Sequence, residues 1–279
     1  MKRLEGKVAV VTGTSPHIGG AIARGFAAEG ARVVCTDLSE SHAKTCAEQI
    51  EAVGGEAFAV AGDVTDPAHV QEVVDRAADR WGHVDVLINN AVWFNKKGLL
   101  TVPLEEYRRQ LDIILGGAFL FTRAAAESMI RTGTRGSIVN ILSTAAWQGE
   151  PGNIAYSTGK SGLINFTRSA AMELARHGIR VNGFTPTVTL PEDPEVARRA
   201  MAEAMAAPSE YPMDFVGQFP LGRLPVPSDY VPALVFLASD ESQMVTGGNI
   251  TVDGGATAKY WPWTPHPGTA EATTSEGGM

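Results

Sequence analysis

The sequence has little cysteine and no long hydrophobic run. Only Cys35 and Cys46 are present among 279 residues, and two cysteines without framework spacing cannot supply the disulfides that small secreted domains use. Cys35 lies in an apolar run and is predicted to be a core residue. No stretch approaches about 18 consecutive apolar residues, so no membrane span is predicted. Residues 1–6 also lack the apolar stretch of a signal peptide. We therefore expect a cytoplasmic protein.

Basic residues are in the minority. Lysine and arginine number 23 against 31 aspartate and glutamate, which gives a formal charge of −8. An acidic chain without a basic run is a poor candidate for binding nucleic acid or an anionic membrane. The histidines are scattered and the two cysteines are far apart, so no metal site is predicted. A hydrophobic content of 44% is ordinary for a globular protein.

Apolar, β-branched runs alternate with helical patterns along the chain. Strands are expected at 7–12, 31–36, 57–61, 84–88, 137–141, 180–184 and 249–252. Helices are expected at 18–29, 41–53, 104–130, 154–177, 195–206 and 229–238, and Asp66-Pro67 opens another as N-cap and first helical residue. This alternation predicts an α/β fold with a parallel sheet and right-handed crossovers.

Two segments depart from this rhythm. No linker divides the chain before Gly255, so residues 1–255 are predicted to be one domain. Residues 186–224 are rich in proline, methionine and alanine and are interpreted as an insertion. Residues 256–279 form a tail that begins with aromatic residues and is expected to be disordered from about Pro265.

A glycine-containing turn, Thr12–Gly19, joins the first strand to the first helix. Glycines let a backbone approach a pyrophosphate, and the helix N-terminus offers free N–H groups and the positive end of the helix dipole. The pattern alone equally fits an ordinary strand–helix turn. Its place at the first βα connection favours a dinucleotide. The turn residues expected to contact the cofactor are Gly13, Ser15, His17, Ile18 and Gly19.

Asp37 follows the second predicted strand, roughly 20 residues past the glycines, as in dinucleotide sites. Its carboxylate can accept hydrogen bonds from both ribose hydroxyls of adenosine and would repel the 2′-phosphate of NADP. The alternative is a turn residue, with Ser39 or Ser41 capping the next helix. No arginine or lysine lies between Gly13 and Gly19, or at Leu38 or Ser39, to bind that phosphate, so NAD is the predicted cofactor.

Tyr156 and Lys160 lie four residues apart at the start of a predicted helix and share one face of it. A free tyrosine has a pKa of about 10, and a nearby ammonium in a partly desolvated site favours the phenolate. We therefore expect Lys160 to lower the pKa of Tyr156, which then acts as general acid or base. Ser143, which follows a predicted strand, would hydrogen-bond the same substrate oxygen. Each residue alone fits a surface pair or a turn, but the combination favours catalysis.

The chain resembles the short-chain dehydrogenase/reductase family over about 4–255. The resemblance rests on motifs in the family's order and spacing: the Gly13–Gly19 turn, Asp37, Gly62-Asp63-Val64, Asn89-Asn90-Ala91, Ser143, Tyr156 with Lys160, Arg180-Val181-Asn182 with Pro186, and Val252-Asp253-Gly254-Gly255. It implies a single Rossmann-type, doubly wound sheet with helices on both faces. It also implies hydride transfer between nicotinamide and a carbonyl or alcohol carbon.

The resemblance also implies site residues and partners. Asp63 and Val64 would lie at the adenine, Asn89 and Ala91 would line the cofactor, and Lys160 would also bind the nicotinamide ribose. The segment after Pro186, including Val188, would contact the carboxamide and then form a substrate lid. The partners expected are a small-molecule substrate and further copies of the chain, as a dimer or tetramer through the helices predicted at 104–130 and 154–177.

Four positions depart from the family pattern: His17, Val92 and Thr187 replace common glycines, and Ile114 stands where a catalytic asparagine usually lies. That asparagine helps to hold a water that relays protons to the lysine, so the relay is in question at Ile114. These departures leave open a second reading, a catalytically impaired NAD-binding regulator. A hydrolase is disfavoured because Ser143 lacks a Gly-x-Ser-x-Gly motif.

Aromatic residues gather in the segments that the family places around the substrate. The candidates for direct substrate contact are Trp93, Trp147 and Phe215; Phe94, Phe219, Tyr260, Trp261 and Trp263 lie in the same segments. Any one of them equally fits a core or subunit interface. As a group they predict a wide apolar pocket for a bulky hydrophobic or aromatic alcohol or ketone.

Overall fold

The computed structural model describes residues 2–206, 210, 211, 213, 216–260 and 263. Its strands pair in parallel to form one sheet in the order β3-β2-β1-β4-β5-β6-β7. The strands are β1 (Val8–Thr12), β2 (Arg32–Asp37), β3 (Ala57–Ala61), β4 (Val86–Asn89), β5 (Ser137–Ile141), β6 (Arg180–Thr185) and β7 (Asn249–Thr251). The predicted α/β fold is confirmed.

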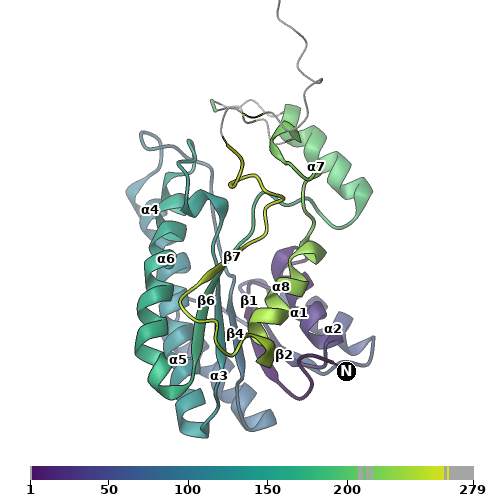
Figure 1. Cartoon of the computed structure of the whole chain (residues 1–279), viewed down its shortest axis with the longest axis vertical. Coiled ribbons are helices and arrows are strands. Elements are labelled where there is room, and N and C mark those ends of the chain that lie inside the picture. Colours follow the sequence, from purple (N-terminus) through teal and green to yellow (C-terminus); the bar gives the residue numbers. More distant parts are fainter. Residues whose placement is uncertain (1, 207–209, 212, 214–215, 261–262, 264–279) are drawn as a thin grey trace, which may run out of the picture.

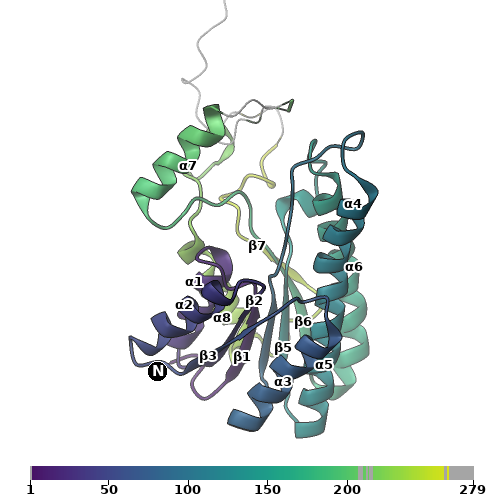
Figure 2. The same cartoon turned by 180° about the vertical axis from the view of Figure 1, so that it is seen from behind.

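Helices cover both faces of the sheet. One face carries α1 (Ile18–Ala28), α2 (Glu40–Glu51) and α8 (Val231–Ala238), and the other carries α3 (Pro67–Trp81), α5 (Gly117–Thr132) and α6 (Ile154–Leu174). Figures 1 and 2 show these two layers from opposite sides, with α4 (Leu104–Leu111) beside α6. The arrangement is that of a doubly wound Rossmann-type domain.

Alternation along the buried strands builds two cores. Ala9 and Val11 of β1 belong to the core under α1, α2 and α8, whereas Val8 and Val10 belong to the core under α3 and α5. Successive strand residues point to opposite faces, so a strand covered on both sides is apolar at every position. All five residues of β1 are buried. Cys35 is also buried, as predicted.

The strand order reverses between β1 and β4, where β1 pairs with both β2 and β4. The chain crosses to opposite sides of β1 there, and ligands of open α/β sheets bind outside the carboxyl ends of such strands. The helix α7 (Pro194–Ala206) belongs to the 186–224 insertion and lies at one end of the molecule, beyond the sheet (Figure 1). The insertion therefore lies beside the predicted cofactor and substrate region.

Local signals place several helix ends correctly. The Asp66 side chain accepts a hydrogen bond from the Ala68 N–H at 2.9 Å, and Pro67 occupies the first helical position of α3. Ser39, one of the two capping serines considered, is the N-cap of α2. Asp37 is the last residue of β2 and does not lie beyond it.

The helix predicted over 104–130 is divided. A π-helical turn, η1 (Asp112–Gly116), separates α4 from α5. The π turn ends where the chain packs closely on the loop after β3: a Cβ on Gly117 would lie 2.8 Å from the Val64 side chain. By length and composition Leu104–Thr132 could span a membrane, but 56% of its most apolar window is buried in the fold. Its apolar character is accounted for by packing on the sheet.

Candidate active site

Three chemically suited side chains meet beyond the carboxyl end of β5. Ser143 lies two residues past β5 and is the N-cap of a short 3-10 turn, η2 (Thr144–Ala146). Tyr156 and Lys160 lie in the first turns of α6, which is fixed to η2 because the Ser161 hydroxyl donates to the Ala146 carbonyl at 2.7 Å. The Ser143 hydroxyl hydrogen-bonds the Tyr156 phenol. The sequence-predicted trio is therefore assembled.

The electrostatics of this trio differ from the prediction. Burial raises the pKa of Tyr156, the Ser143 hydrogen bond opposes that rise, and the charge of Glu150 adds to it. Burial lowers the pKa of Lys160 to about 7. The expectation that Lys160 lowers the pKa of Tyr156 is thus wrong for this structure. The Lys160 Nζ donates to the Ile141 carbonyl at 2.6 Å and lies 5.7 Å from the centre of the Tyr156 ring.

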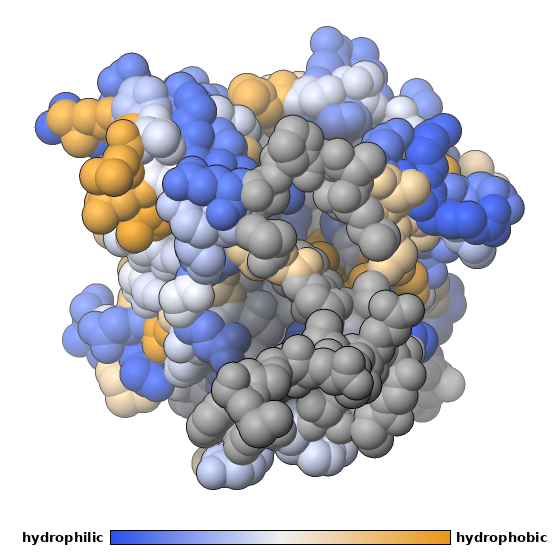
Figure 3. Space-filling model, turned by 90° about the horizontal axis from the view of Figure 1, so that it is seen from above, coloured by the Kyte–Doolittle hydropathy of each residue, from blue (hydrophilic) through white to orange (hydrophobic). Residues whose placement is uncertain are grey.

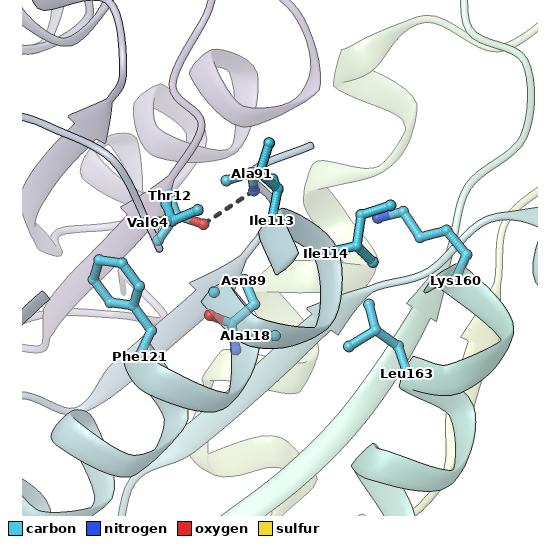
Figure 4. A pocket seen from close by; sticks show the side chains of 11 residues that line it. Thr12, Val64, Asn89, Ala91, Ile113, Ile114, Ala118, Phe121, Lys160 and Leu163 are labelled. Carbon is cyan, nitrogen blue, oxygen red and sulfur yellow. Dashed lines mark hydrogen bonds between the residues drawn. The ribbon is translucent and has the colours of Figure 1, made fainter. Parts of the chain in front are cut away.

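Ile114 lies in the π turn, directly against α6, the helix that carries Tyr156 and Lys160. A Cβ on Gly159 would come within 3.0 Å of the Ile114 side chain, and Ile114 belongs to an apolar cluster with Leu163. Beside it is a cavity of about 10 Å³, lined by both residues and by Asn89 and Lys160 (Figure 4). Figure 4 shows the Lys160 side chain reaching from α6 toward Ile114. This space is about that of one water molecule.

The turn between β1 and α1 is closely packed around its glycines. Gly13 has φ +71°, and a Cβ there would lie 2.9 Å from the Ala91 Cα; a Cβ on Gly19 would lie 1.9 Å from the Gly13 carbonyl oxygen. Ser15 accepts hydrogen bonds through its carbonyl from the N–H groups of His17 and Gly20, at 2.6 and 3.0 Å. No larger residue could hold this backbone at the start of α1. The turn therefore fits a ligand that binds main-chain N–H groups, such as a pyrophosphate.

A second polar atom supports this fit. The Thr14 hydroxyl is buried within the turn and has no hydrogen-bond partner in the described residues. Buried polar groups are nearly always hydrogen-bonded in native proteins, so an orphaned hydroxyl inside a glycine cradle is consistent with a polar ligand there.

Asparagine side chains after β4 hold the turn in place. The Asn90 amide donates to the carbonyls of Thr12 and Gly13 at 3.1 and 2.8 Å. The Ala91 N–H donates to the Thr12 hydroxyl at 3.0 Å, as drawn in Figure 4. Asn89 is buried, and its amide donates to Asn140 on β5 at 2.8 Å. Asn90 was missed in the sequence because its partners lie on a strand distant in the chain.

Asp37 is positioned at the carboxyl end of β2 with one free oxygen. Its Oδ1 accepts the Ser39 N–H at 2.9 Å and lies 3.5 Å from His42 Nδ1. Within the described residues, Oδ2 accepts no hydrogen bond. The side chain is 12% exposed, so a diol could reach it.

Asp63 and Val64 follow β3 and contact the α4–α5 region. The Asp63 carboxylate accepts hydrogen bonds from the Thr65 N–H and hydroxyl at 2.9 and 2.7 Å and forms an ion pair with Arg109 of α4. Burial raises the pKa of Asp63, but the Thr65 hydrogen bonds and the Arg109 ion pair outweigh burial and lower it. Val64 is buried against Gly117. Arg109 was not identified from the sequence because it lies on another helix.

His17 neither projects freely into solvent nor approaches charged groups. Its imidazole hydrogen-bonds the backbone of Thr189, and burial lowers its pKa despite that bond. The segment that follows β6 thus contacts the glycine turn. The same segment contacts the catalytic side, since the Thr144 N–H donates to the Pro186 carbonyl at 3.0 Å. Pro186, Thr187 and Val188 therefore connect the two halves of the site.

The aromatic residues predicted near the substrate separate into two groups. Phe94 lies 5.6 Å from Tyr156 between ring centres and is 48% exposed. Trp93 and Trp147 are also partly exposed, and the Trp147 indole N–H donates to Thr185 at 3.2 Å. Phe219 differs from this exposed group: its side chain is buried in the interior and packs near Gly254, so it does not line an open substrate pocket. Phe215 and Trp261 lie outside the described residues.

Further hydrophobic side chains are exposed at the rim of this end of the molecule. Figure 3, which views the end bearing α7, shows a hydrophobic group on the side of α4. Three leucines are exposed there: Leu99 and Leu100 in the loop before α4, and Leu104 at the first position of α4. Gly98 of this loop lies beside Gly152 and Tyr211, so the loop, the segment before α6 and the insertion surround the same space.

Comparison with known proteins gives matches along nearly the whole chain. A family model described as enoyl-(acyl carrier protein) reductase matches residues 13–257. Among curated relatives, L-rhamnose 1-dehydrogenase (NAD(P)(+)) of a Sphingomonas species is 39% identical over 258 residues, covering 91% of this chain and 98% of the relative. Galactitol 2-dehydrogenase of Agrobacterium fabrum is 37% identical over 255 residues, covering 91% and 98%.

A solved structure agrees in fold. A short-chain type dehydrogenase/reductase from Mycobacterium marinum superposes with a TM-score of 0.81 at 31% identity, covering 92% of this chain and 97% of that one. Its sequence similarity and its coverage both exceed what a shared sheet topology alone would produce.

Proposed function

Because this chain belongs to the short-chain dehydrogenase/reductase family, we propose that it transfers a hydride between NAD(H) and a secondary alcohol or ketone, with Tyr156 as acid/base. The relatives indicate that the protein is an NAD(P)-dependent dehydrogenase. The observation that carries the proposal is the assembly of Ser143, Tyr156 and Lys160 beside the glycine turn.

The residues of the trio divide the proton chemistry among them. In alcohol oxidation the Tyr156 phenolate takes the hydroxyl proton, and in ketone reduction the phenol returns it. Ser143 donates its hydroxyl proton to the same oxygen and orients it. Burial lowers the pKa of Lys160 to about 7, so its charge is sensitive to pH near 7. When Lys160 is protonated, its ammonium would offset part of the burial that raises the pKa of Tyr156. When bound, NAD(H) supplies the hydride acceptor or donor.

The cofactor would be held at the switch point of the sheet. Main-chain N–H groups of the Gly13–Gly19 turn would bind the pyrophosphate, Asp37 would accept the ribose hydroxyls, and the loop at Asp63 and Val64 would border the adenine. Ala91, Pro186 and Val188 would line the cofactor between these groups and the trio. The close approach of Ala91 to Gly13 supports placing them along one ligand.

NAD is the proposed cofactor, in preference to NADP. The free Oδ2 of Asp37 supports this choice, because a carboxylate that accepts the 2′-hydroxyl repels a 2′-phosphate. Asp37→Ala should weaken NAD use and narrow the gap between the cofactors, as measured by kcat/KM for each. Equal use of NADP and NAD by the wild-type protein would contradict the preference.

A bulky hydrophobic or aromatic substrate is proposed from the surroundings of Tyr156. The exposed Phe94 ring lies against it, and Trp93 and Trp147 are exposed in the flanking segments. Apolar walls of this kind favour an apolar substituent on the reacting carbon. Arg198, on the insertion, is engaged by Glu195 and is exposed. It is therefore not committed to a substrate carboxylate.

A polyhydroxylated substrate is the second candidate. The Glu150 carboxylate lies close enough to affect the Tyr156 phenol, and it accepts the Asn153 amide N–H at 3.2 Å. A carboxylate at this position can accept a hydrogen bond from a second hydroxyl, and relatives are named for rhamnose and galactitol. Comparing kcat/KM for 1-phenylethanol and galactitol, in wild type and Glu150→Gln, separates the two candidates. A galactitol preference that Glu150→Gln removes would favour the polyol.

Turnover itself separates the enzyme from a catalytically impaired NAD-binding regulator. We expect purified protein to reduce or oxidise members of an alcohol and ketone panel with NADH or NAD. NAD binding by calorimetry, without turnover across that panel, would favour the regulator.

Self-association is also proposed. Phe119 on α5 and Met172 on α6 are exposed, and an apolar contact between copies would cover such side chains. A dimer or tetramer in the cytoplasm is expected, with no nucleic acid or membrane partner. Light scattering of the purified chain measures its mass directly, and a monomer would contradict this proposal.

A further inference from the structure

The carboxylate proposed to choose the cofactor has an imidazole beside it. His42 Nδ1 lies 3.5 Å from Asp37 Oδ1, and the His42 side chain is 46% exposed. His42 lies in the first turn of α2, where the Ser39 hydroxyl accepts its N–H. This turn starts three residues after Asp37, so its geometry is fixed by the same short connection that positions the carboxylate.

Other charged groups on the elements around this pair have partners of their own. Arg24 of α1 donates to Gln49, Glu40 of α2 pairs with Lys44, and Asp63 beyond β3 pairs with Arg109. The thiol of Cys46, one turn along α2, is buried. Among the described residues, His42 is the basic side chain within ion-pair distance of Asp37.

The charge of this imidazole decides the net charge at the ribose. A 2′-oxygen that hydrogen-bonds Asp37 would lie about 3 Å from its carboxylate, and the His42 ring stands beside the same carboxylate, 3.5 Å from its Oδ1. A neutral His42 leaves the full negative charge of Asp37 facing a 2′-phosphate. A protonated His42 would offset that charge and so weaken the repulsion of the phosphate.

We propose that His42 determines how strongly the protein discriminates between NAD and NADP, and that protonation of His42 relaxes this discrimination. The proposal deepens the NAD preference proposed above and rests on it. An imidazole is the side chain that changes charge between about pH 5 and 8. Use of NADP relative to NAD should therefore rise as the pH falls through that range.

The experiment measures kcat/KM for NADP divided by that for NAD from pH 5.5 to 8.5, with one substrate. In the wild type we expect the ratio to rise about tenfold on acidification, the effect of one nearby unit charge at a partly exposed site. His42→Gln should remove most of that rise. His42→Arg should give a high ratio at every pH, because its charge is permanent.

The design includes two controls. The 2′-phosphate itself gains a proton near pH 6, and this affects every variant equally, so the wild type is read against His42→Gln at each pH. His83→Gln removes a similar histidine–aspartate pair, His83 Nε2 to Asp85 Oδ2 at 2.9 Å, at the amino end of β4. It should leave the ratio as in the wild type.

The outcomes distinguish the two proposals. A ratio that changes with pH in parallel in the wild type and His42→Gln, or an His42→Arg variant that rejects NADP as strongly as the wild type at pH 8.5, would overturn the role of His42. Equal use of both cofactors by the wild type at pH 8.5 contradicts the NAD preference. A pH dependence of the NADP-to-NAD ratio that disappears in His42→Gln supports the role of His42, whether or not the wild type prefers NAD.

Discussion

The two halves of the site are built differently. On the cofactor side, the Gly13–Gly19 turn is fixed by close backbone contacts and by the Asn90 amide, and added carbon atoms would clash. On the substrate side, the side chains of Phe94, Trp93 and Trp147 are partly exposed. The difference indicates that the cofactor is recognised by a rigid backbone and the substrate by replaceable side chains.

The largest expected effect falls on the trio that lies between the two halves. Tyr156→Phe removes the proton-transferring hydroxyl and keeps the ring, so kcat should fall by about 10³-fold or more, whereas the Kd for NAD should change less than about twofold. Steady-state rates and fluorescence titration measure the two quantities. Tyr211→Phe, an exposed tyrosine on the insertion, is the matched control. Appreciable activity in Tyr156→Phe would remove this residue from its role.

The rigidity of the cofactor half can be tested with one carbon atom. Gly19→Ala would place a Cβ 1.9 Å from the Gly13 carbonyl oxygen, whereas a Cβ on Gly149 of the substrate half meets nothing within 4 Å. We expect the Kd for NAD to rise about 100-fold or more in Gly19→Ala and to change little in Gly149→Ala. Circular dichroism checks that both variants fold. Similar affinities in the two variants would mean that the turn adapts.

Lys160 makes stability depend on pH. Burial depresses its pKa from 10.5 to about 7, so between those values the unfolded chain binds a proton that the folded chain does not. Stability of the cofactor-free protein should therefore increase with pH above about 7, and the burial penalty is fully present below it. The effect should reach a few kcal/mol. Lys160→Met should flatten this part of the pH dependence, as measured by urea unfolding from pH 6 to 9. An unchanged slope of the unfolding free energy against pH would mean that a group other than Lys160 causes it.

Smaller effects are expected on the substrate side, where single walls can be removed. Phe94→Ala or Trp147→Ala should raise KM for large apolar substrates by about three- to tenfold and change KM for small ones less, since one partly exposed ring face contributes about 1 kcal/mol. Removal of residues 260–279 should act in the same direction. Indifference to all three changes, or a preference for short charged substrates, would overturn the apolar pocket.

The sequence predicted most of the fold because buried parallel strands are apolar throughout, and the strands at 57–61 and 137–141 match within a residue. Contacts between side chains of segments distant in the chain could not be predicted from the sequence. Arg109 reaches Asp63 from another helix, and Phe94 was placed near the substrate without its contact to Tyr156. The predicted direction of the Tyr156 pKa shift was wrong because burial is the largest influence on that pKa, and burial depends on the assembled fold.

The π turn at Ile114 was not predicted from the sequence either. Substitution of Ile114 gives the smallest predicted effect on kcat. A π turn leaves main-chain carbonyls free of regular helical partners, and such turns often occur at functional sites. We expect a proton relay from Lys160 to use these carbonyls or another route, so that the Ile114 side chain contributes only packing against Gly159 and Leu163.

Ile114→Asn should then raise kcat or leave it within about threefold, while the melting temperature falls because an amide replaces an apolar group in the cluster. Ile114→Ala serves as the control that removes volume without adding polarity. Both variants are followed by kcat and by thermal unfolding. A collapse of kcat in an Ile114→Asn protein that is shown to be folded would mean that packing at this position controls the geometry of the trio, and the cofactor side would then not be the only rigid half.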